Sequence, residues 1–168
     1  MIFVTVGTEK FPFDRLIRTL DEAKRSGRIQ QEVFAQIGAS TYLPQACDYS
    51  RFLSFSSMIE YIRNADIIIG HAGVGTVLLS RQSNKIPIIF ARQKVFGEHV
   101  DDHQIQFARK MEQEGLVIAA YNEQDLLDKI YNYQQIIKGV RQQHPSSSRD
   151  TTLVDYIRKI ISVTEIAI

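Results

Sequence analysis

Residues 67–76 decide the fold, and they read Ile67-Ile68-Ile69-Gly70-His71-Ala72-Gly73-Val74-Gly75-Thr76. Apolar side chains at successive positions are typical of a strand that is buried on both faces, whereas a strand with one solvated face alternates apolar and polar residues. The glycines that follow predict a turn into an apolar helix over residues 75–84. A buried strand, a glycine-rich turn and a helix, in this order, are typical of a parallel sheet with helices on both faces.

The same alternation of strands and helices continues along the chain. β-Branched runs predict strands near residues 2–6, 32–37, 51–55, 66–69, 87–91 and 116–119. Helical periodicity predicts helices near residues 13–26, 57–64, 75–84, 101–114, 123–138 and 151–163. Ser57 with Glu60 predicts a capping box, and Asn122 and Thr151 predict helix N-caps. The fold class is therefore α/β, a doubly wound parallel sheet of about six strands.

The length of 168 residues predicts one domain with an appended helix. We expect the domain over residues 1–138, a linker over the polar residues 139–150, and a C-terminal amphipathic helix and tail over residues 151–168. The apolar stripe of this helix comprises Leu153, Val154, Ile157, Ile160 and Ile161. Two surfaces fit such a stripe: the flank of the chain's own domain, or a partner chain.

Composition excludes several classes of protein. The 20 Lys and Arg residues nearly balance the 19 Asp and Glu residues, so the net charge of +1 disfavours nucleic acid as a partner. The one cysteine, Cys47, forms no intramolecular disulfide and no cysteine-rich zinc site. No apolar stretch approaches the roughly 20 residues that a membrane-spanning helix needs, and the amino end lacks the pattern of a signal peptide. We therefore expect a cytoplasmic protein.

Ligands of parallel α/β sheets bind at the carboxyl ends of the strands, so the loops there hold the candidate residues. The loop at Gly7 and Thr8 lacks the three glycines of a dinucleotide-binding fingerprint, which disfavours an oxidoreductase, and a plain tight turn also explains it. The loop over residues 71–76 frees successive backbone N–H groups beside a helix N-terminus, as a diphosphate requires. Close packing of helix on strand is the alternative explanation for its glycines. His71 is either a structural residue or a donor to a phosphate or sugar oxygen.

The third loop, residues 92–104, is the longest and the most polar. His99 and His103 lie four positions apart among acidic residues, so a metal site is one interpretation. A charged helix start with Asp101 as a cap is a second one. We favour a third, a cluster of donors and acceptors for a polyhydroxyl ligand, in which Asp102 and Gln104 contact sugar hydroxyls and Arg92 faces phosphate.

Four motifs occur together along the first 120 residues. They are Phe3-Val4-Thr5-Val6-Gly7-Thr8 with Pro12-Phe13-Asp14-Arg15-Leu16, then His71-Ala72-Gly73-Val74-Gly75-Thr76, Lys85-Ile86-Pro87, and Gly97-Glu98-His99-Val100-Asp101-Asp102-His103-Gln104. In this order they resemble the C-terminal domain of glycosyltransferase family 28. The likeness is greatest to two-component members, such as the catalytic subunit of the dolichol-linked N-acetylglucosaminyltransferase and bacterial capsule and exopolysaccharide transferases.

The resemblance implies one Rossmann-like half of a GT-B glycosyltransferase, with the other half on a separate chain. It implies a UDP-sugar donor whose diphosphate contacts Gly7, Thr8 and residues 71–76, and whose sugar faces Asp102, His103 and Gln104. Arg92 and His99 are the other residues expected to bind the nucleotide sugar. Neither a metal nor a cofactor is implied. The partner would be a membrane-associated subunit that binds a lipid-linked glycan acceptor and supplies the base, so that no catalytic residue is assigned to this chain. The C-terminal stripe then becomes a candidate partner interface, and the chain a peripheral protein at the inner face of the membrane.

One stretch departs from the family pattern. Many members carry a glutamate for the ribose hydroxyls in the helix after the glycine loop, but this chain has Val77-Leu78-Leu79-Ser80-Arg81-Gln82 there. Either Ser80, Gln82 or backbone groups replace the glutamate, or the chain is a non-catalytic enhancer that stabilises a separate glycosyltransferase.

Overall fold

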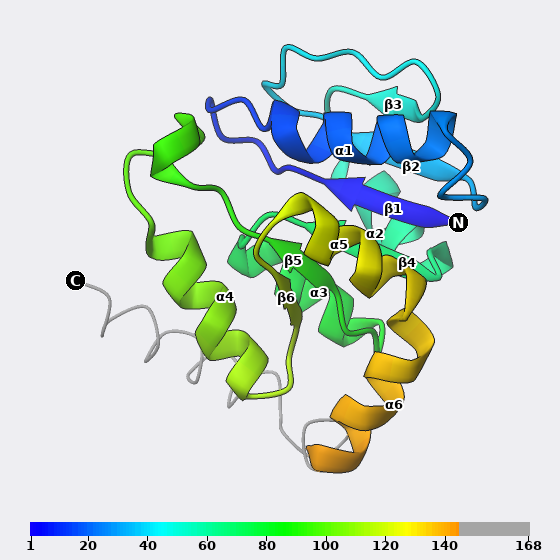
Figure 1. Ribbon diagram of the computed structural model, residues 1–168, viewed down its shortest axis with the longest axis vertical. Helices are drawn as coiled ribbons and strands as arrows, with labels where there is room; N and C mark the ends of the chain where they lie inside the picture. Colours follow the sequence, from blue (N-terminus) through cyan, green and yellow to red (C-terminus); the bar gives the residue numbers. More distant parts are fainter. Residues whose placement is uncertain (145–168) are drawn as a thin grey trace.

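The computed structural model describes residues 1–144, and these form a parallel β-sheet covered by helices on both faces (Figure 1). The strands are β1 (Ile2–Thr5), β2 (Val33–Gln36), β3 (Asp48–Ser50), β4 (Ile67–Gly70), β5 (Ile88–Phe90) and β6 (Ile118–Ala120). Their order in the sheet is β3-β2-β1-β4-β5-β6, and every pairing is parallel. Val4 of the central strand β1 pairs with Ala35 on one side and Ile69 on the other. The predicted doubly wound sheet is confirmed.

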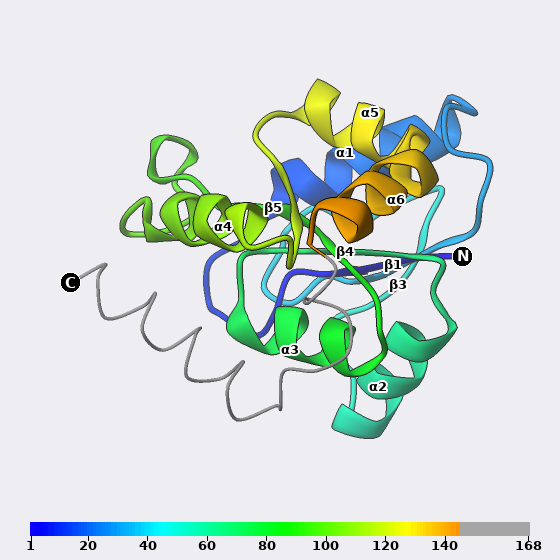
Figure 2. The ribbon, with the colours of Figure 1, turned by 90° about the horizontal axis from the view of Figure 1, so that it is seen from below.

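Helices follow the strands and divide between the two faces of the sheet. They are α1 (Asp14–Arg25), α2 (Phe55–Asn64), α3 (Val74–Gln82), α4 (His103–Gln113), α5 (Glu123–Tyr131) and α6 (Tyr133–Gln143), with a short 3₁₀ helix η1 (Lys94–Phe96) before α4. Figure 2 shows α1, α5 and α6 on one face and α2 and α3 on the other. Among residues 1–144, no helix is long and apolar enough to cross a membrane.

Successive residues of β1 and β4 are buried in different cores, which explains their uninterrupted apolar sequence. Val4 and Ile69 pack with Leu16 and Leu126 from α1 and α5. The neighbouring Ile68 packs with Phe3 of β1 and with the α2 side, on the opposite face. Alternating side chains of a strand point to opposite faces, so a sheet between two helical layers needs apolar residues at every position.

The third strand was predicted in the wrong place. Residues 51–55 are not a strand, because β3 ends at Ser50 and α2 begins at Phe55. The N-cap of α2 is Ser54 instead of Ser57: the Ser54 hydroxyl accepts a hydrogen bond from the Ser57 N–H at 3.1 Å. β3 carries the polar sequence Asp-Tyr-Ser and is largely exposed at the sheet edge, so apolar patterning does not reveal it.

The helix predicted over residues 123–138 is two helices. Asn132 separates α5 from α6, and its side-chain amide donates to the Asp128 carbonyl at 2.9 Å, a local bond that competes with helical continuation. α6 runs on to Gln143, into the segment expected to be a linker. Asn122 is confirmed as a cap, because its side chain accepts from the Asp125 N–H at 2.9 Å. The rest of that segment, Thr151 and the helix over residues 151–168 lie outside the described residues.

Candidate functional site

The candidate site lies at the carboxyl ends of β1 and β4, where the chain connections change from one face of the sheet to the other (Figure 2). β1 and β4 are neighbours in the sheet, but the helix after β1 lies on one face and the helix after β4 lies on the other. The connecting loops therefore diverge at the carboxyl ends of these two strands, which is the position where sheets of this kind bind ligands, and we call this candidate position the crevice. The loop after β5 borders the same edge, so the three loops singled out from the sequence are brought together.

The glycine-rich loop ends in an uncapped helix N-terminus. β4 ends at Gly70, and α3 begins at Val74 with Gly73 as its N-cap, which has no side chain to accept hydrogen bonds. The N–H groups of Val74, Gly75 and Thr76, in the first turn, have no acceptors within the helix. Together with the helix dipole, these donors favour an anion.

The imidazole of His71 fills the space between the first two loops. A Cβ on Gly7 would lie 2.5 Å from His71 Cε1, and a Cβ on Gly73 would overlap His71 Nε2. Both glycines are therefore required by the close approach of the ring. His71 is only 9% exposed, and its Nδ1 is buried without a hydrogen-bond partner in the described part of the chain. Burial, helped by the charge of Arg92, lowers the pKa of His71 to about 4, so the ring is neutral at pH 7.

Gly7 shapes the first loop but has no free N–H. Its φ of +76° is in the left-handed region, which favours glycine. Its N–H donates to Gln36 Oε1 at 3.1 Å, and its carbonyl accepts from Gln36 Nε2 at 2.9 Å. The backbone of Gly7 is thus occupied by the fold, and the contribution of this glycine is steric. Thr8, the next residue, is exposed at the rim.

Arg92 does not face the crevice, contrary to its expected role toward phosphate. Its side chain is completely buried, and its two terminal nitrogens donate to backbone carbonyls. The acceptors are Val6 at 3.0 Å, Phe11 and Pro12 at 2.9 Å each, and Glu98 at 3.3 Å. Arg92 therefore connects the loop after β1 with the loop after β5 by hydrogen bonds in the protein interior.

A buried ion pair holds the third loop in place, and sequence reasoning missed it. Arg15 Nε and Nη2 donate to the two carboxylate oxygens of Glu98 at 2.8 and 2.9 Å. The Arg15 guanidinium also lies over the rings of Phe90 and Phe96, at 4.2 and 4.6 Å from their centroids. Both charged residues stand in the quoted motifs, which was the available signal, but nothing in the sequence paired them.

The remaining polar residues of the third loop lie at the start of α4 or shortly before it. Asp102 Oδ1 accepts from the Lys94 N–H at 2.9 Å, and Gln104 Oε1 accepts from the Arg92 N–H at 3.3 Å. Both side chains therefore help to shape the loop. His103 is exposed at the start of α4, and His99 is half-buried against the ring of Phe11, 5.3 Å between centroids.

Asp101 lies between the two histidines and directly before Asp102, the N-cap of α4. Its Oδ1 accepts from the His103 N–H at 3.0 Å and lies 3.1 Å from His99 Nδ1. The backbone bond from His103 is the main cause of the lowered pKa of this carboxyl. In residues 1–144, no group of three or more His, Cys, Asp or Glu side chains is arranged to hold a metal ion.

The residues considered for ribose do not reach the crevice. Ser80 is completely buried, and its hydroxyl has no hydrogen-bond partner in the described residues. Gln82 is exposed but ends α3, about 12 Å from the first turn at 1.5 Å per residue. Backbone groups and the rim residues are the groups left to contact a ribose.

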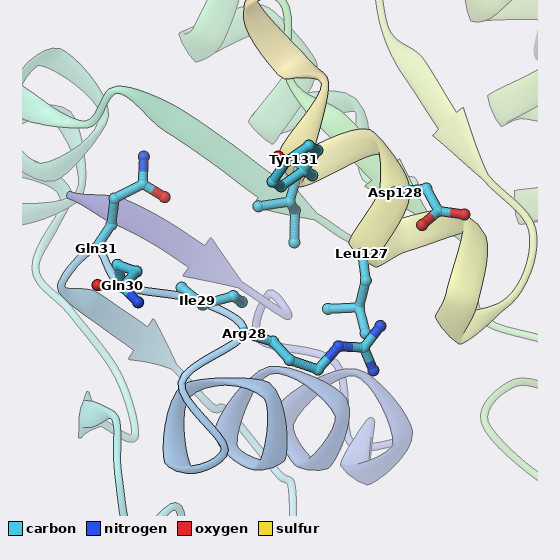
Figure 3. Close-up of a pocket in the computed structure, with 8 residues that line it drawn as sticks. Arg28, Ile29, Gln30, Gln31, Leu127, Asp128 and Tyr131 are labelled. Carbon is cyan, nitrogen blue, oxygen red and sulfur yellow. The ribbon is translucent and has the colours of Figure 1, made fainter.

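A groove on another part of the surface is separate from this site. It holds a volume of about 360 Å³ and is lined by residues 28–31 and by one side of α5, including Leu127, Asp128 and Tyr131 (Figure 3). Residues 28–31 lead into the amino end of β2, so the groove lies at the amino ends of the strands, whereas the glycine loops lie at their carboxyl ends. Arg28 is hydrogen-bonded to Gln124 at 3.4 Å, and the groove contains no buried polar group that lacks a partner.

Comparison with known proteins finds similarity to glycosyltransferases. The model of the glycosyltransferase family 28 C-terminal domain matches residues 1–159. The UDP-N-acetylglucosamine transferase subunit ALG13 of Homo sapiens is 28% identical over 123 residues, which cover 68% of this chain and 10% of that protein. The protein of the same name from Mus musculus is 28% identical over 125 residues, with coverages of 67% and 10%. The chain thus spans about a tenth of the length of these relatives.

Solved structures share the fold. The glycosyltransferase SnogD from Streptomyces nogalater superimposes with a TM-score of 0.56 at 13% identity, over 96% of this chain and 43% of that one. The calicheamicin glycosyltransferase CalG4 superimposes with a TM-score of 0.56 at 10% identity, over 99% of this chain and 43% of that one. The chain therefore matches less than half of each solved glycosyltransferase.

Proposed function

The chain belongs to the glycosyltransferase family 28 C-terminal domain family, and from that premise we propose that it is the donor-binding, catalytic subunit of a two-component inverting glycosyltransferase. The donor is a UDP-sugar. The observation that carries the proposal is the first turn of α3, where unpaired N–H groups and the neutral ring of His71 converge at the crevice. This arrangement suits a diphosphate, because backbone donors and a helix dipole stabilise negative charge without a metal.

The proposed reaction forms a bond between the anomeric carbon of the sugar and an acceptor oxygen, while the bond from that carbon to the UDP oxygen breaks. Negative charge then grows on the departing diphosphate, and the first turn of α3 stabilises it. Asp102, His103 and Gln104, at the start of α4, are the residues that orient the sugar in this proposal. The proton of the acceptor hydroxyl passes to a base on the partner subunit.

The partner is the second half of the enzyme. The matched relatives are named as subunits, and the solved glycosyltransferases are more than twice as long as the region matched here. We propose a membrane-associated subunit that binds a lipid-linked glycan acceptor, so that the chain acts at the cytoplasmic face of the membrane through this subunit. Synthesis of a capsule, an exopolysaccharide or a related glycan is the corresponding role. The apolar stripe from Leu153 to Ile161 is a proposed part of the contact.

A second candidate function is that of a non-catalytic enhancer that stabilises a separate glycosyltransferase. The supporting observation is the burial of Ser80, which leaves α3 without a side chain for the ribose near its first turn. The two functions differ in whether this chain binds the donor.

Calorimetric titration with UDP and a panel of UDP-sugars tests the proposal. In the matched variant Gly75→Val, the added Cβ has no neighbouring atom within 4 Å outside its own helix backbone, and it stands in the first turn of α3. We expect binding by the wild type and a loss of at least tenfold in affinity in Gly75→Val. The control is Gly139→Val in α6, where a side chain also meets open space, and it should bind like the wild type.

Two results would contradict the donor-binding function. One is equal affinity of Gly75→Val and wild type, which would place the ligand elsewhere. The other is an absence of binding by the folded chain both alone and with its partner subunit, which would favour the enhancer.

A further inference from the structure

We infer that Gln36, a residue of β2 outside the crevice, is the positioning residue of the proposed donor site, through its hold on Gly7 and His71. The inference rests on the proposed function. Gln36 is 1% exposed and lies at the carboxyl end of its strand, where β2 pairs with β1. It carries no charge and belongs to none of the three loops, so neither motif nor composition singles it out.

The side-chain amide of Gln36 is fully hydrogen-bonded. Its Oε1 accepts from Thr5 Oγ1 at 2.7 Å and from the Gly7 N–H at 3.1 Å. Its Nε2 donates to the carbonyls of Gly7 and Arg51, both at 2.9 Å. One side chain thus satisfies both backbone groups of Gly7 and ties them to the segment before α2. A carboxamide with two donors and two acceptor positions is the group that this arrangement needs.

The contacts continue from Gly7 to the anion site. Gly7 is held in its left-handed conformation against the ring of His71, and the same ring abuts Gly73, the N-cap of α3. The His71 N–H donates to the Thr5 carbonyl at 3.3 Å, and the hydroxyl of Thr5 is bonded to Gln36. A movement of Gly7 therefore changes the packing of the His71 ring. This ring also contacts Gly73, next to the N–H groups proposed to bind the diphosphate.

Glutamate is the sharpest replacement, because it keeps the size of glutamine and replaces the NH2 donor by a negatively charged acceptor oxygen. A carboxylate at this position would place an oxygen against the carbonyls of Gly7 and Arg51, with no proton to offer them. A buried carboxylate oxygen without donors and carbonyls that have lost theirs are both costly, so the Gly7 loop should leave its place. Thr5→Val is the milder variant, since it keeps the shape and all the other hydrogen bonds of the Gln36 amide. It removes the bond from the Thr5 hydroxyl to Gln36 and the long bond, at 3.4 Å, from the Gly7 N–H to Thr5 Oγ1.

The test combines UDP affinity, measured by calorimetry, with hydrogen exchange of individual amides, measured by NMR. In Gln36→Glu we expect UDP affinity to fall at least tenfold and exchange at Gly7 and His71 to accelerate at least tenfold, with exchange in α5 unchanged. Thr5→Val should show smaller effects of the same kind. The control Gln135→Glu makes the same change at an exposed position on α6 and should alter neither readout.

The readouts separate this inference from the proposed function. If Gln36→Glu and Thr5→Val bind UDP like the wild type, or if exchange at Gly7 and His71 does not change, the positioning role is wrong. If exchange accelerates throughout the chain, the role of Gln36 is general stability, and the inference also fails. If the wild type does not bind UDP at all, the proposed function fails, while the exchange of Gly7 and His71 still decides whether Gln36 orders them.

Discussion

Arg15 and Glu98, 83 positions apart, form a bidentate ion pair that joins the helix after β1 to the loop after β5. Both side chains are nearly buried, with 12% and 5% of their surfaces exposed. The Glu98 carboxylate also accepts from the Gln93 N–H at 2.9 Å. The pair thus holds one wall of the crevice against the body of the domain.

Removing one partner of this pair should be costly. Glu98→Ala removes the bidentate partner of the largely buried Arg15 guanidinium and leaves only Glu123 Oε1, at 3.7 Å, as a counter-charge, so we expect the free energy of unfolding to fall by about 2–4 kcal/mol. The control is Lys110→Ala, which breaks the exposed pair with Glu114 and should cost about 0.5 kcal/mol or less. Urea denaturation measures both. Similar small losses in the two variants would show that the Arg15–Glu98 pair contributes little.

The cost of a side chain at Gly7 should exceed that at Gly27. The two glycines have nearly equal φ values, +76° and +77°, but a Cβ on Gly27 has no neighbour within 4 Å, while one on Gly7 meets His71. Gly27→Ala therefore reports conformational strain alone, about 1–2 kcal/mol. We expect Gly7→Ala to lower the free energy of unfolding by at least twice as much. Equal losses would mean that His71 moves aside freely.

His71 should make stability fall as pH decreases from 6.5 to about 4. Burial is the main reason that the pKa of His71 in the folded chain lies at about 4, below the ordinary histidine value of 6.5. Protonation therefore favours the unfolded chain, and the contribution of neutral His71 is present above pH 6.5 and lost as pH falls through this range. The full loss is roughly 3 kcal/mol. Urea denaturation at several pH values measures this loss, and the free energy of unfolding of His71→Gln should not show it. If the free energies of variant and wild type fall in parallel with pH, the ring of His71 is not buried and neutral.

Ionised Asp21 should stabilise the folded chain, and this contribution should be lost at a lower pH than that of His71. This buried carboxylate on α1 accepts from the Tyr42 hydroxyl at 2.7 Å and from the N–H groups of residues 45–47. Burial alone would raise the pKa of Asp21, but these hydrogen bonds outweigh it and lower the pKa below the ordinary aspartate value of 3.8. Its contribution is therefore present above pH 3.8 and lost as pH falls through the folded pKa. Asp21→Asn should be less stable than wild type at pH 6, and the difference should narrow near pH 3. An unchanged difference in urea denaturation would contradict this.

The local parts of the structure were predictable from the sequence. The run Ile67–Ile69 and the glycines after it show the buried strand, the turn and the helix directly, because each signal lies within a few residues. Ligands of such sheets bind at the carboxyl ends of the strands, and this generalisation predicted that the three loops lie close together. β3 was misplaced, since its three polar residues carry no apolar pattern and its pairing with β2 depends on residues far along the chain.

The parts that failed depend on long-range contacts. Arg92 was assigned to phosphate, but its partners Phe11 and Pro12 lie about 80 positions earlier and enclose it completely. Gln36 was not noticed, because its role arises only where β2 and β1 pair. A sequence shows which side chains can donate or accept, and the fold decides whether a ligand or the backbone takes them.

The location of the donor site is the central claim, and NMR mapping of backbone amides during titration with UDP tests it most directly. We expect the largest shifts at Gly73, Val74, Gly75 and Thr76, followed by Thr8 and residues 102–104. Residues of the groove at the amino ends of the strands, such as Arg28 and Tyr131, should not shift. Saturable shifts confined to that groove, with the first turn of α3 unaffected, would contradict the account.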